Sequence, residues 1–495
     1  MLRFRPVLLI ARVAPLACLL LASALLVPSL VSAAASDAQK QTRIAEAAVD
    51  YMVRTQSPSV SIYVDRGGTP FMTQAWGIAD LEHTTPATVE SAYEMGSITK
   101  SVTAHAVLQL VVAGRVSLTG KVSDYISDCP KPAADATIHQ LLTHTSGIPD
   151  YVNDNVPELK SRVETDSLSR EEILHALASQ PLKFPSGSRY KYSNSNYYLL
   201  GLIVERVTGR DFYDVVQHDV LQPLGVGPMF SGNTLEIVPQ RARAYRFDDK
   251  GMLQNTPPFT YLTFFSAGSL VATPTTLGRY RRAVFMSDKM DPRVRDLIMT
   301  TVPVAEGGLT DYTMGALNKT HFAGLLKFAH AGGSWGHASY NAYYPERDVT
   351  IVVMGNRHLS HAGPDYLERK IARILFDVPD PAVRPALAFS SARYVGIYKR
   401  VGGYVGRYRS HGSPLYYSVA EEHGQLAVGA GERPDDPLLQ WRAPIAAIAQ
   451  DEFGYAGDGL EPDPEREEHL LFDGSDVAGH AKRLRIGDIT AEYAP

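Results

Sequence analysis

One stretch constrains this chain more than any other: residues 94–104, which read EMGSITKSVTA. Apolar residues recur at helical spacing from Val102 onward, and Gly114 ends the run. The pattern predicts a helix with Ser97 in its first turn and Lys100 one turn further along the same face. Because a lysine at this spacing can take the serine proton, the stretch predicts a nucleophile and its base.

A lysine acts as a base only when it is neutral. Burial lowers a lysine pKa because it disfavours the charged form, and the positive end of a helix dipole acts in the same direction. The same dipole stabilises a developing alkoxide on Ser97. Ser-x-x-Lys also occurs by chance in helices with an exposed lysine, so the catalytic interpretation depends on the rest of the chain.

The N-terminal segment Met1–Ala33 predicts a secretory signal peptide. Three arginines near its start precede an apolar run over 13–31, and VSA at 31–33 matches a small-x-small cleavage pattern. An uncleaved membrane anchor is the alternative because the apolar run is long, although Pro15 and Pro28 disfavour it. We therefore expect a periplasmic or secreted protein with no stable membrane span after cleavage.

Charge and cysteine content exclude several classes. Removing the signal changes the formal net charge from -5 to -8, with 45 basic side chains left against 53 acidic ones. No basic block remains for nucleic acid or an anionic membrane surface. Cys18 lies in the signal, inside an apolar run that continues past it, so we do not expect it to be lipidated. Cys129 is then the one cysteine of the mature chain, which excludes an internal disulfide framework.

A length of 495 residues predicts more than one domain. Residues 59–64 and 73–78 are expected to form a hairpin around DRGG at 65–68. Residues 266–273 predict a turn or a short strand. The remaining patterns predict helices at about 39–54, 196–207, 274–285 and 365–376, and strands at 312–316, 325–329, 340–344 and 350–354.

Prolines cluster at 379–385 and predict a linker. Beyond it, short alternating segments separated by turn residues predict a small all-β domain, with strands at 394–398, 415–419, 426–428, 438–441 and 481–486. The predicted organisation is a signal peptide at 1–33, a catalytic domain at 36–378, a linker at 379–385 and a β domain at 386–495.

Other polar residues have competing interpretations. His144 lies among turn residues, so we expect it to hold a loop by hydrogen bonds and not to act in catalysis. Tyr192 and Asn194 lie in a loop before a helix, where binding groups often occur, but aromatic packing and a helix cap would also explain them. His358 and His361 are spaced like metal ligands, yet a single pair on a loop predicts no metal site.

Four motifs follow one another: SITK at 97–100, LLTHTSG at 141–147, YSN at 192–194 and HAGG at 330–333. Their order resembles the class C β-lactamase-like serine hydrolases, which include DD-peptidases, D-aminopeptidases, esterases and penicillin-binding-protein relatives. The resemblance spans about residues 40 to 380. The C-terminal domain is similar to the lipocalin-like β domain that some members carry.

The resemblance implies catalytic roles for three side chains. Ser97 would attack a carbonyl and become acylated, and Lys100 would accept or relay its proton. Tyr192, as a phenolate or a hydrogen-bonded phenol, would serve proton transfer to the leaving group and later activate water. The backbone N–H groups of Ser97 and Gly333 would form the oxyanion hole.

Three further residues would bind or orient. Asn194 would hydrogen-bond the substrate or orient Lys100, and His330 and Gly332 would bind the substrate. The chemistry needs no metal and no cofactor. The implied fold is α/β (α+β), with an antiparallel sheet flanked by helices. The early hairpin and the strands after residue 310 would form this sheet, and about 105–260 a helical lobe, with the site between them.

The third motif departs from the family pattern, because Ala331 replaces the hydroxyl residue that helps bind a substrate carboxylate in Lys-Thr-Gly or His-Thr-Gly members. We therefore expect weak penicillin turnover and better activity on neutral esters or amides. The alternatives are a β-lactamase or D-alanyl-D-alanine carboxypeptidase, and a non-catalytic binding or regulatory protein with the same fold. The expected partner is a small molecule or peptide with an ester or amide bond. The sequence does not indicate an oligomeric state.

Overall fold

A computed structural model describes residues 35–379, except for 155, 160–161, 163–167, 234, 249–250, 258–260, 304–308 and 359–362. Beyond residue 395 it describes the strands named below and Ala481. The predicted signal peptide, His361, the predicted linker from residue 380 onward and the predicted strand at 438–441 lie outside the described residues. Among the helices that are described, none combines the length and apolar character needed to cross a bilayer.

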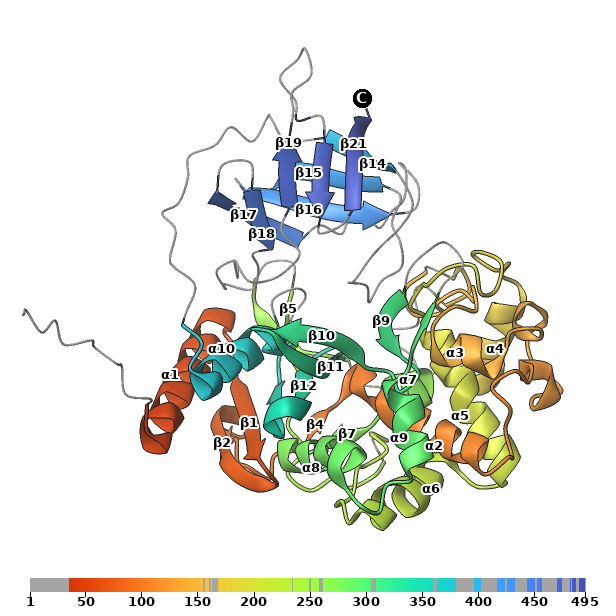
Figure 1. The fold of residues 1–495 in the computed structure, drawn as a ribbon, viewed down its shortest axis with the longest axis horizontal. Coiled ribbons are helices and arrows are strands. Elements are labelled where there is room, and N and C mark those ends of the chain that lie inside the picture. The colour runs from red at the N-terminus through yellow and green to blue at the C-terminus, as the bar shows by residue number, and fades with distance from the viewer. Residues whose placement is uncertain are drawn as a thin grey trace, which may run out of the picture.

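A nine-stranded antiparallel sheet forms the centre of the fold (Figure 1). Its order is β3-β2-β1-β13-β12-β11-β10-β9-β8. The strands are β1 (Ser59–Arg66), β2 (Thr69–Asp80), β3 (Thr85–Pro86), β8 (Thr301–Pro303), β9 (Leu309–Thr313), β10 (Asn318–Phe322), β11 (Leu325–Gly333), β12 (Ala338–Tyr344) and β13 (Val349–Gly355). Pairing of β1 with β13, from Val60↔Gly355 to Arg66↔Val349, brings the early hairpin to the later strands. The predicted antiparallel sheet is confirmed.

The predicted hairpin is confirmed, and its turn explains the glycine pair. Gly67 and Gly68 connect β1 to β2 with φ angles of 59° and 84°. A two-residue turn of this kind requires positive φ at both central positions, which glycine adopts without a steric penalty.

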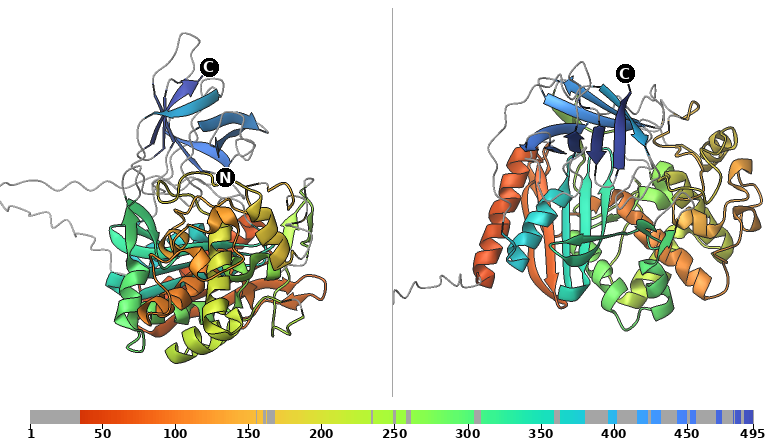
Figure 2. Two further views of the ribbon diagram at one scale, coloured as in Figure 1. Left: turned by 90° about the vertical axis from the view of Figure 1, so that its right-hand side faces the viewer. Right: turned by 45° about the horizontal axis from the view of Figure 1, so that its top comes forward.

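Helices cover both faces of the sheet. The helices α1 (Asp37–Thr55) and α10 (Pro364–Phe376) pack together on one face, and α8 (Pro274–Met286) packs on β1, β12 and β13 from the other (Figure 2). The strands alternate accordingly. Ile351 and Val353 join the core under α1 and α10, while Val352 and Met354 join the core under α8. Because both faces of β13 are buried, this strand reads as a nearly continuous apolar run, VTIVVMG.

The helical lobe surrounds α2 (Thr99–Val112). Apolar or small residues occupy most positions of α2, and all of residues 99–108 are buried. A helix of this composition lies inside a protein and not at its surface. The lobe also contains α3 (Ile138–Leu142), α4 (Arg170–Ala178), α5 (Asn194–Thr208), α6 (Phe212–Val215), α7 (Tyr261–Gly268) and α9 (Pro292–Met299).

The expectation of a turn or short strand at 266–273 was half right. Residues 266–268 end α7, and only β7 (Val271–Ala272) is a strand, paired with β4 (Tyr93–Glu94). The helix α7 packs on α5 and α2, and this tertiary contact decides its conformation. A second small hairpin, β5 (Tyr245–Phe247) and β6 (Leu253–Asn255), lies between α6 and α7 in the chain.

The C-terminal strands form a closed barrel, which confirms the small all-β fold (Figure 1). The strands are β14 (Gly396–Val401), β15 (Tyr416–Glu422), β16 (Gln425–Gly431), β17 (Ala443–Ala449), β18 (Glu452–Tyr455), β19 (Leu470–Asp473), β20 (Arg483–Ile486) and β21 (Ile489–Ala494). They follow one another around the barrel, and β14 pairs with β21 to close it. Closure removes the sheet edges that would otherwise stay unpaired.

Candidate active site

Ser97 lies in a single 3-10 turn, Gly96–Ile98, directly before α2, so it precedes the helix that was expected to contain it. Gly96 has a φ of 52°, and a Cβ built on it would lie 2.5 Å from the backbone N and O of Gly333. The backbone of the Ser97 turn therefore lies directly against the end of β11. Only glycine permits this approach.

A second glycine brings the same two segments together. A Cβ on Gly332 would lie 1.9 Å from the Met95 carbonyl oxygen. The Ser339 hydroxyl of β12 donates a hydrogen bond to that carbonyl at 2.9 Å. These contacts hold Ser97 at the edge of the third-motif strand, where the resemblance implies an oxyanion hole.

Lys100 is fully buried and its ammonium nitrogen has three oxygen neighbours. Nζ lies 3.1 Å from Ser97 Oγ, 2.8 Å from Asn194 Oδ1 and 2.6 Å from the Ala267 carbonyl oxygen. Burial lowers the pKa of Lys100 to about 7, against the opposing effect of the nearby Asp150 carboxylate. A large fraction of Lys100 is therefore neutral at neutral pH, as a base requires.

Tyr192 approaches Ser97 from the loop before α5. Its hydroxyl donates a hydrogen bond to Ser97 Oγ at 2.8 Å, and Lys100 Nζ lies 4.8 Å from its ring centroid. Burial raises the pKa of Tyr192 far above the usual value for a phenol. Of the two forms considered from the sequence, the geometry fits the hydrogen-bonded phenol.

Asn194 is the first residue of α5 and connects Lys100 to a carboxylate. Its Oδ1 accepts from Lys100, and its Nδ2 donates to both oxygens of Asp150, at 3.2 and 3.0 Å. Burial, together with the neighbouring Asp154, raises the pKa of Asp150, and hydrogen bonds from Val152, Asn153 and Asn194 oppose that rise. No motif in the sequence indicates a role for Asp150.

The side chain of His330 is buried and turned to Tyr312. His330 Nε2 lies 3.2 Å from the Tyr312 hydroxyl, and Nδ1 lies 2.5 Å from the Ala331 carbonyl oxygen. Burial lowers the pKa of His330 to about 3, so the ring is neutral at pH 7. The next residue, Ala331, is exposed, as is Gly333. The third motif therefore presents a methyl group and backbone to solvent, with no cation from His330.

His144 holds a loop, as expected. It is fully buried and its Nδ1 accepts a hydrogen bond from the Ser193 backbone N–H at 3.1 Å. Its ring packs at centroid distances of 4.3 Å from Tyr192 and 5.0 Å from Tyr312. His144 thus packs against the ring of Tyr192 and helps to hold it in place. In the described part of the chain, no three His, Cys, Asp or Glu side chains are grouped so that they could hold a metal ion.

Comparison with known proteins identifies the fold and its chemistry. A family model described as Beta-lactamase matches residues 44–376. The chain belongs to the beta-lactamase family. It is an enzyme of the serine hydrolase group that includes class C β-lactamases and penicillin-binding proteins.

Two curated relatives illustrate the range of this beta-lactamase family. Penicillin-binding protein 4* of Bacillus subtilis (strain 168) is 25% identical over 392 residues, or 74% of this chain and 84% of the relative. Esterase EstB of Burkholderia gladioli is 34% identical over 174 residues, or 33% of this chain and 44% of the relative. The match to the esterase therefore spans less than half of its length.

Solved structures of other proteins share the fold. The octameric penicillin-binding protein homologue from Pyrococcus abyssi superposes with a TM-score of 0.62 at 21% identity, covering 91% of this chain and 99% of that chain. D-amino acid amidase from Ochrobactrum anthropi SV3, complexed with D-phenylalanine, gives a TM-score of 0.58 at 23% identity, with 69% and 99% covered.

Proposed function

We propose that this enzyme is an exported hydrolase that cleaves a neutral ester or amide through an acyl-enzyme on Ser97. The observation that carries the proposal is the convergence of two groups on one oxygen. Lys100 Nζ at 3.1 Å and the Tyr192 hydroxyl at 2.8 Å both contact Ser97 Oγ. A base and an acid beside one serine are the components of acyl transfer.

The acylation step follows from these positions. Neutral Lys100 takes the Ser97 proton while Oγ attacks the carbonyl carbon, and the backbone N–H groups of Ser97 and Gly333 stabilise the oxyanion. Tyr192 then donates its phenol proton to the leaving group and regains one from the protonated Lys100. Because burial disfavours a free phenolate, Tyr192 passes its proton to the leaving group as it takes up the proton from Lys100.

Deacylation reverses the proton path. A water molecule attacks the acyl carbonyl and passes a proton through Tyr192 to Lys100. The tetrahedral intermediate then collapses, the acid product leaves, and Lys100 returns the proton to Ser97. Over the whole cycle the Ser97 proton departs with the leaving group, and one proton of the attacking water replaces it on Ser97. Lys100 and Tyr192 return to their starting forms, so these steps call for no metal and no cofactor.

The preference for a neutral substrate rests on the third motif and on an aromatic pair. Ala331 offers no hydroxyl and His330 is neutral, so neither adds a charge-assisted hydrogen bond to a carboxylate, which is worth about 1.5–3 kcal/mol. Phe264 and Trp335 meet edge to face at 5.4 Å. Trp335 follows Gly333 by two residues, and Phe264 packs close to Gly268 beside Gly96. The pair therefore adds apolar surface near the Ser97 turn, which suits an apolar group on the substrate.

A β-lactamase or a D-alanyl-D-alanine carboxypeptidase is the second candidate. The match to a penicillin-binding protein over most of both chains favours it. Its substrates carry a carboxylate next to the scissile bond, so it would need a cation from a residue other than His330.

A single experiment separates the two candidates. The full chain is incubated with a fluorophosphonate probe, with benzylpenicillin, and with a panel that contains a neutral aryl ester, a D-aminoacyl amide and a peptidyl-D-Ala substrate. We expect one fluorophosphonate adduct by intact mass and the highest kcat/KM on a neutral substrate. A higher kcat/KM on benzylpenicillin would establish the second candidate, and the absence of any adduct would exclude both.

Export and domain organisation are part of the proposal. We expect cleavage after residue 33, a catalytic domain at 36–378, a linker at 379–385 and a separate β domain at 386–495. N-terminal sequencing of the secreted protein tests the first boundary. A chain that ends at Pro385 should fold and accept the fluorophosphonate. Loss of both properties would show that the β domain belongs to the catalytic unit.

A further inference from the structure

Lys100 can act as a base only if the lone pair of its neutral amine points to Ser97. A neutral lysine amine carries two N–H donors and one lone pair, and Lys100 Nζ has three neighbours. The Ala267 carbonyl only accepts, so it takes one N–H. If Asn194 presents its oxygen, it takes the second N–H, and the lone pair faces Ser97. If the amide were reversed, its NH2 would donate to the lone pair, and Lys100 could not accept the Ser97 proton.

One residue decides which end of the Asn194 amide faces Lys100. Asp150 is 2% exposed, and both of its carboxylate oxygens lie within hydrogen-bond distance of Asn194 Nδ2, at 3.2 and 3.0 Å. An ionised carboxylate has only acceptors. A reversed amide would place its oxygen against this carboxylate, which is unfavourable in a buried site. The Asn194 oxygen is thereby directed to Lys100.

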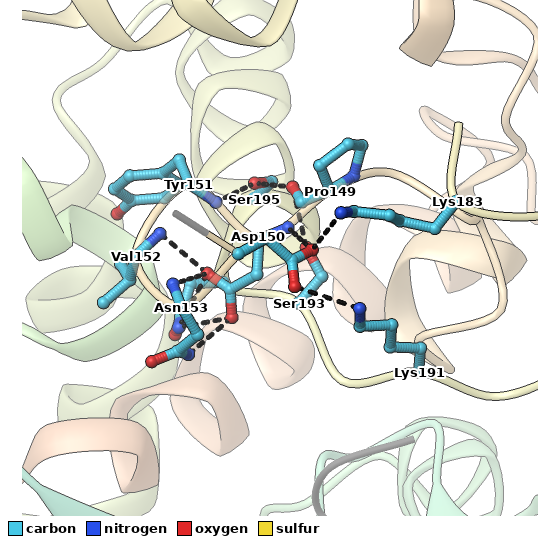
Figure 3. A network of polar contacts seen from close by, with 11 residues as sticks. Pro149, Asp150, Tyr151, Val152, Asn153, Lys183, Lys191, Ser193 and Ser195 are labelled. Carbon is cyan, nitrogen blue, oxygen red and sulfur yellow. Dashed lines mark hydrogen bonds and ion pairs between the residues drawn. The ribbon is translucent and has the colours of Figure 1, made fainter. Parts of the chain in front are cut away.

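Asp150 is itself held rigidly (Figure 3). Its Oδ1 accepts from the Val152 backbone N–H at 2.9 Å, and its Oδ2 accepts from Asn153 Nδ2 at 2.7 Å. On either side of Asp150, Ser195 Oγ donates to the Pro149 carbonyl at 2.5 Å and accepts from the Tyr151 N–H at 3.1 Å. These bonds fix the Asp150 loop to the first turn of α5.

We propose that Asp150 is a positioning residue, which fixes the side-chain amide of Asn194 so that the lone pair of Lys100 faces Ser97 Oγ. The inference rests on the proposed function, in which Lys100 is the base. Asp150 has no role in contacting the substrate. It acts through Asn194, and its negative charge also favours the protonated form of Lys100.

The other ionisable groups around Lys100 stay neutral over the useful pH range. Tyr192 and Tyr197 face it from the α5 side, with raised pKa values caused by burial. His144 and His330 also influence it, and burial lowers the pKa of His144 well below its usual value and that of His330 to about 3.

A second cluster, made of charged side chains, lies next to Asp150 and includes Lys183 and Lys191 (Figure 3). Asp154 Oδ2 accepts from the Asp150 backbone N–H at 2.9 Å, and the Asp154 carboxylate pairs with Lys191 at 3.0 Å and Lys183 at 3.8 Å. Within the described part of the chain, Asp154 makes no hydrogen bond or ion pair with Lys100 or Asn194, and two lysines already compensate its charge. It therefore provides a matched control one step further from the base.

The test is the pH dependence of kcat/KM for a neutral aryl ester, measured on the full chain with Asp150→Asn and Asp154→Asn. Asparagine at 150 can still accept from Val152, so the loop keeps its turn, but it no longer dictates the orientation of Asn194. We expect the plateau that kcat/KM reaches at high pH to fall about 10- to 100-fold, which is the usual cost of a misplaced catalytic group. Removing the charge lowers the pKa of Lys100, so the acidic limb should move to lower pH by about one unit.

Asp154→Asn should leave the acidic limb in place. A purely structural role for Asp150 would lower the melting temperature and the plateau without moving the limb. A purely electrostatic role would move the limb to lower pH without lowering the plateau. Either result, or a limb moved to higher pH, overturns the inference. The total amount of fluorophosphonate that each variant binds counts its folded sites. The values of kcat/KM can then be compared per folded site. If Ser97→Ala still takes up the probe, the proposed function fails and the inference fails with it. An unmoved limb with Ser97-dependent labelling rejects only the role of Asp150.

Discussion

The two sides of Ser97 are built differently. On the α2 and α5 side, each polar group is hydrogen-bonded to the next, from Asp150 through Asn194 and Lys100 to the serine. On the β11 side, Ala331 and Gly333 are exposed, and His330 turns away to Tyr312. The first side is closed and polar, and the second is open and carries backbone and a methyl group.

This difference separates reaction type from substrate choice. In the proposed mechanism the closed side contains the groups that move protons, and the hydrogen bonds between these groups fix their positions. The open side has free surface beside the nucleophile, so its side chains can change which acyl group fits without disturbing the proton path. Substitutions on the closed side should therefore impair proton transfer, whereas substitutions on the open side should change which acyl group fits.

The largest effect should come from the nucleophile itself. Ser97→Ala removes the atom on which both sides converge, so covalent labelling should disappear and kcat should fall by roughly four orders of magnitude or more. Intact mass after fluorophosphonate treatment and steady-state kinetics measure the two quantities. An adduct of unchanged yield would move the nucleophile to another residue.

Changes on the closed side should be large and should not add. Lys100→Ala and Tyr192→Phe each remove one proton-transfer group, a loss worth about 10²–10⁴-fold in kcat. Because the two groups form one relay, the double variant should lose little more than the worse single one. The kinetics of all three variants, with melting temperatures as a folding control, decide this. Fully multiplicative losses would mean that the two groups act independently.

On the open side, two adjacent glycines give a matched pair. Gly332→Ala would place a Cβ 1.9 Å from the Met95 carbonyl oxygen, whereas a Cβ on Gly333 meets no atom within 4 Å. We expect Gly332→Ala to cost about 1–3 kcal/mol of unfolding free energy, as overpacking does, and Gly333→Ala to change it by less than about 0.5 kcal/mol. Denaturant unfolding measures both. Equal values would contradict the backbone contact between β11 and the Ser97 turn.

The smallest effect concerns specificity. Ala331→Thr supplies a hydroxyl on the open side, so kcat/KM for benzylpenicillin should rise about tenfold, which corresponds to one modest hydrogen bond. The value for a neutral aryl ester should change much less. The ratio of the two constants in both proteins is the measurement. Efficient penicillin hydrolysis by the unaltered enzyme, with no further gain in the variant, would show that another residue binds the carboxylate.

Much of the fold could be predicted because periodicity and turn residues are local signals. The β1–β2 hairpin follows from Gly67-Gly68, and α10 from its apolar face. The strand β10 could not be predicted in this way. It reads NKTHF, with one apolar residue, and it is a strand because it pairs with β11 from Asn318↔Ala329 to Phe322↔Leu325. Pairing with a distant segment leaves no pattern in the strand itself.

The candidate site divides along the same line. Residue type and motif spacing indicate the chemistry of four side chains, which could therefore be predicted: Ser97, Lys100, Tyr192 and Asn194. The Ala267 carbonyl, which lies 2.6 Å from Lys100 Nζ, is a backbone group and carries no signal of residue type. Asp150 could not be predicted because a loop aspartate is usually solvated, and only the packed structure shows that this one is buried.

Pairing of β1 with β13 has a consequence for how the chain reaches its native state. These neighbours come from the beginning and the end of the catalytic sequence, so the middle of the sheet cannot form until β13 is available. Until then, the β1–β2 hairpin has an unpaired edge with apolar residues on it, a surface to which other chains can add. Contacts between such distant segments also form slowly. We therefore expect the early hairpin to be prone to intermolecular pairing while the protein is unfinished.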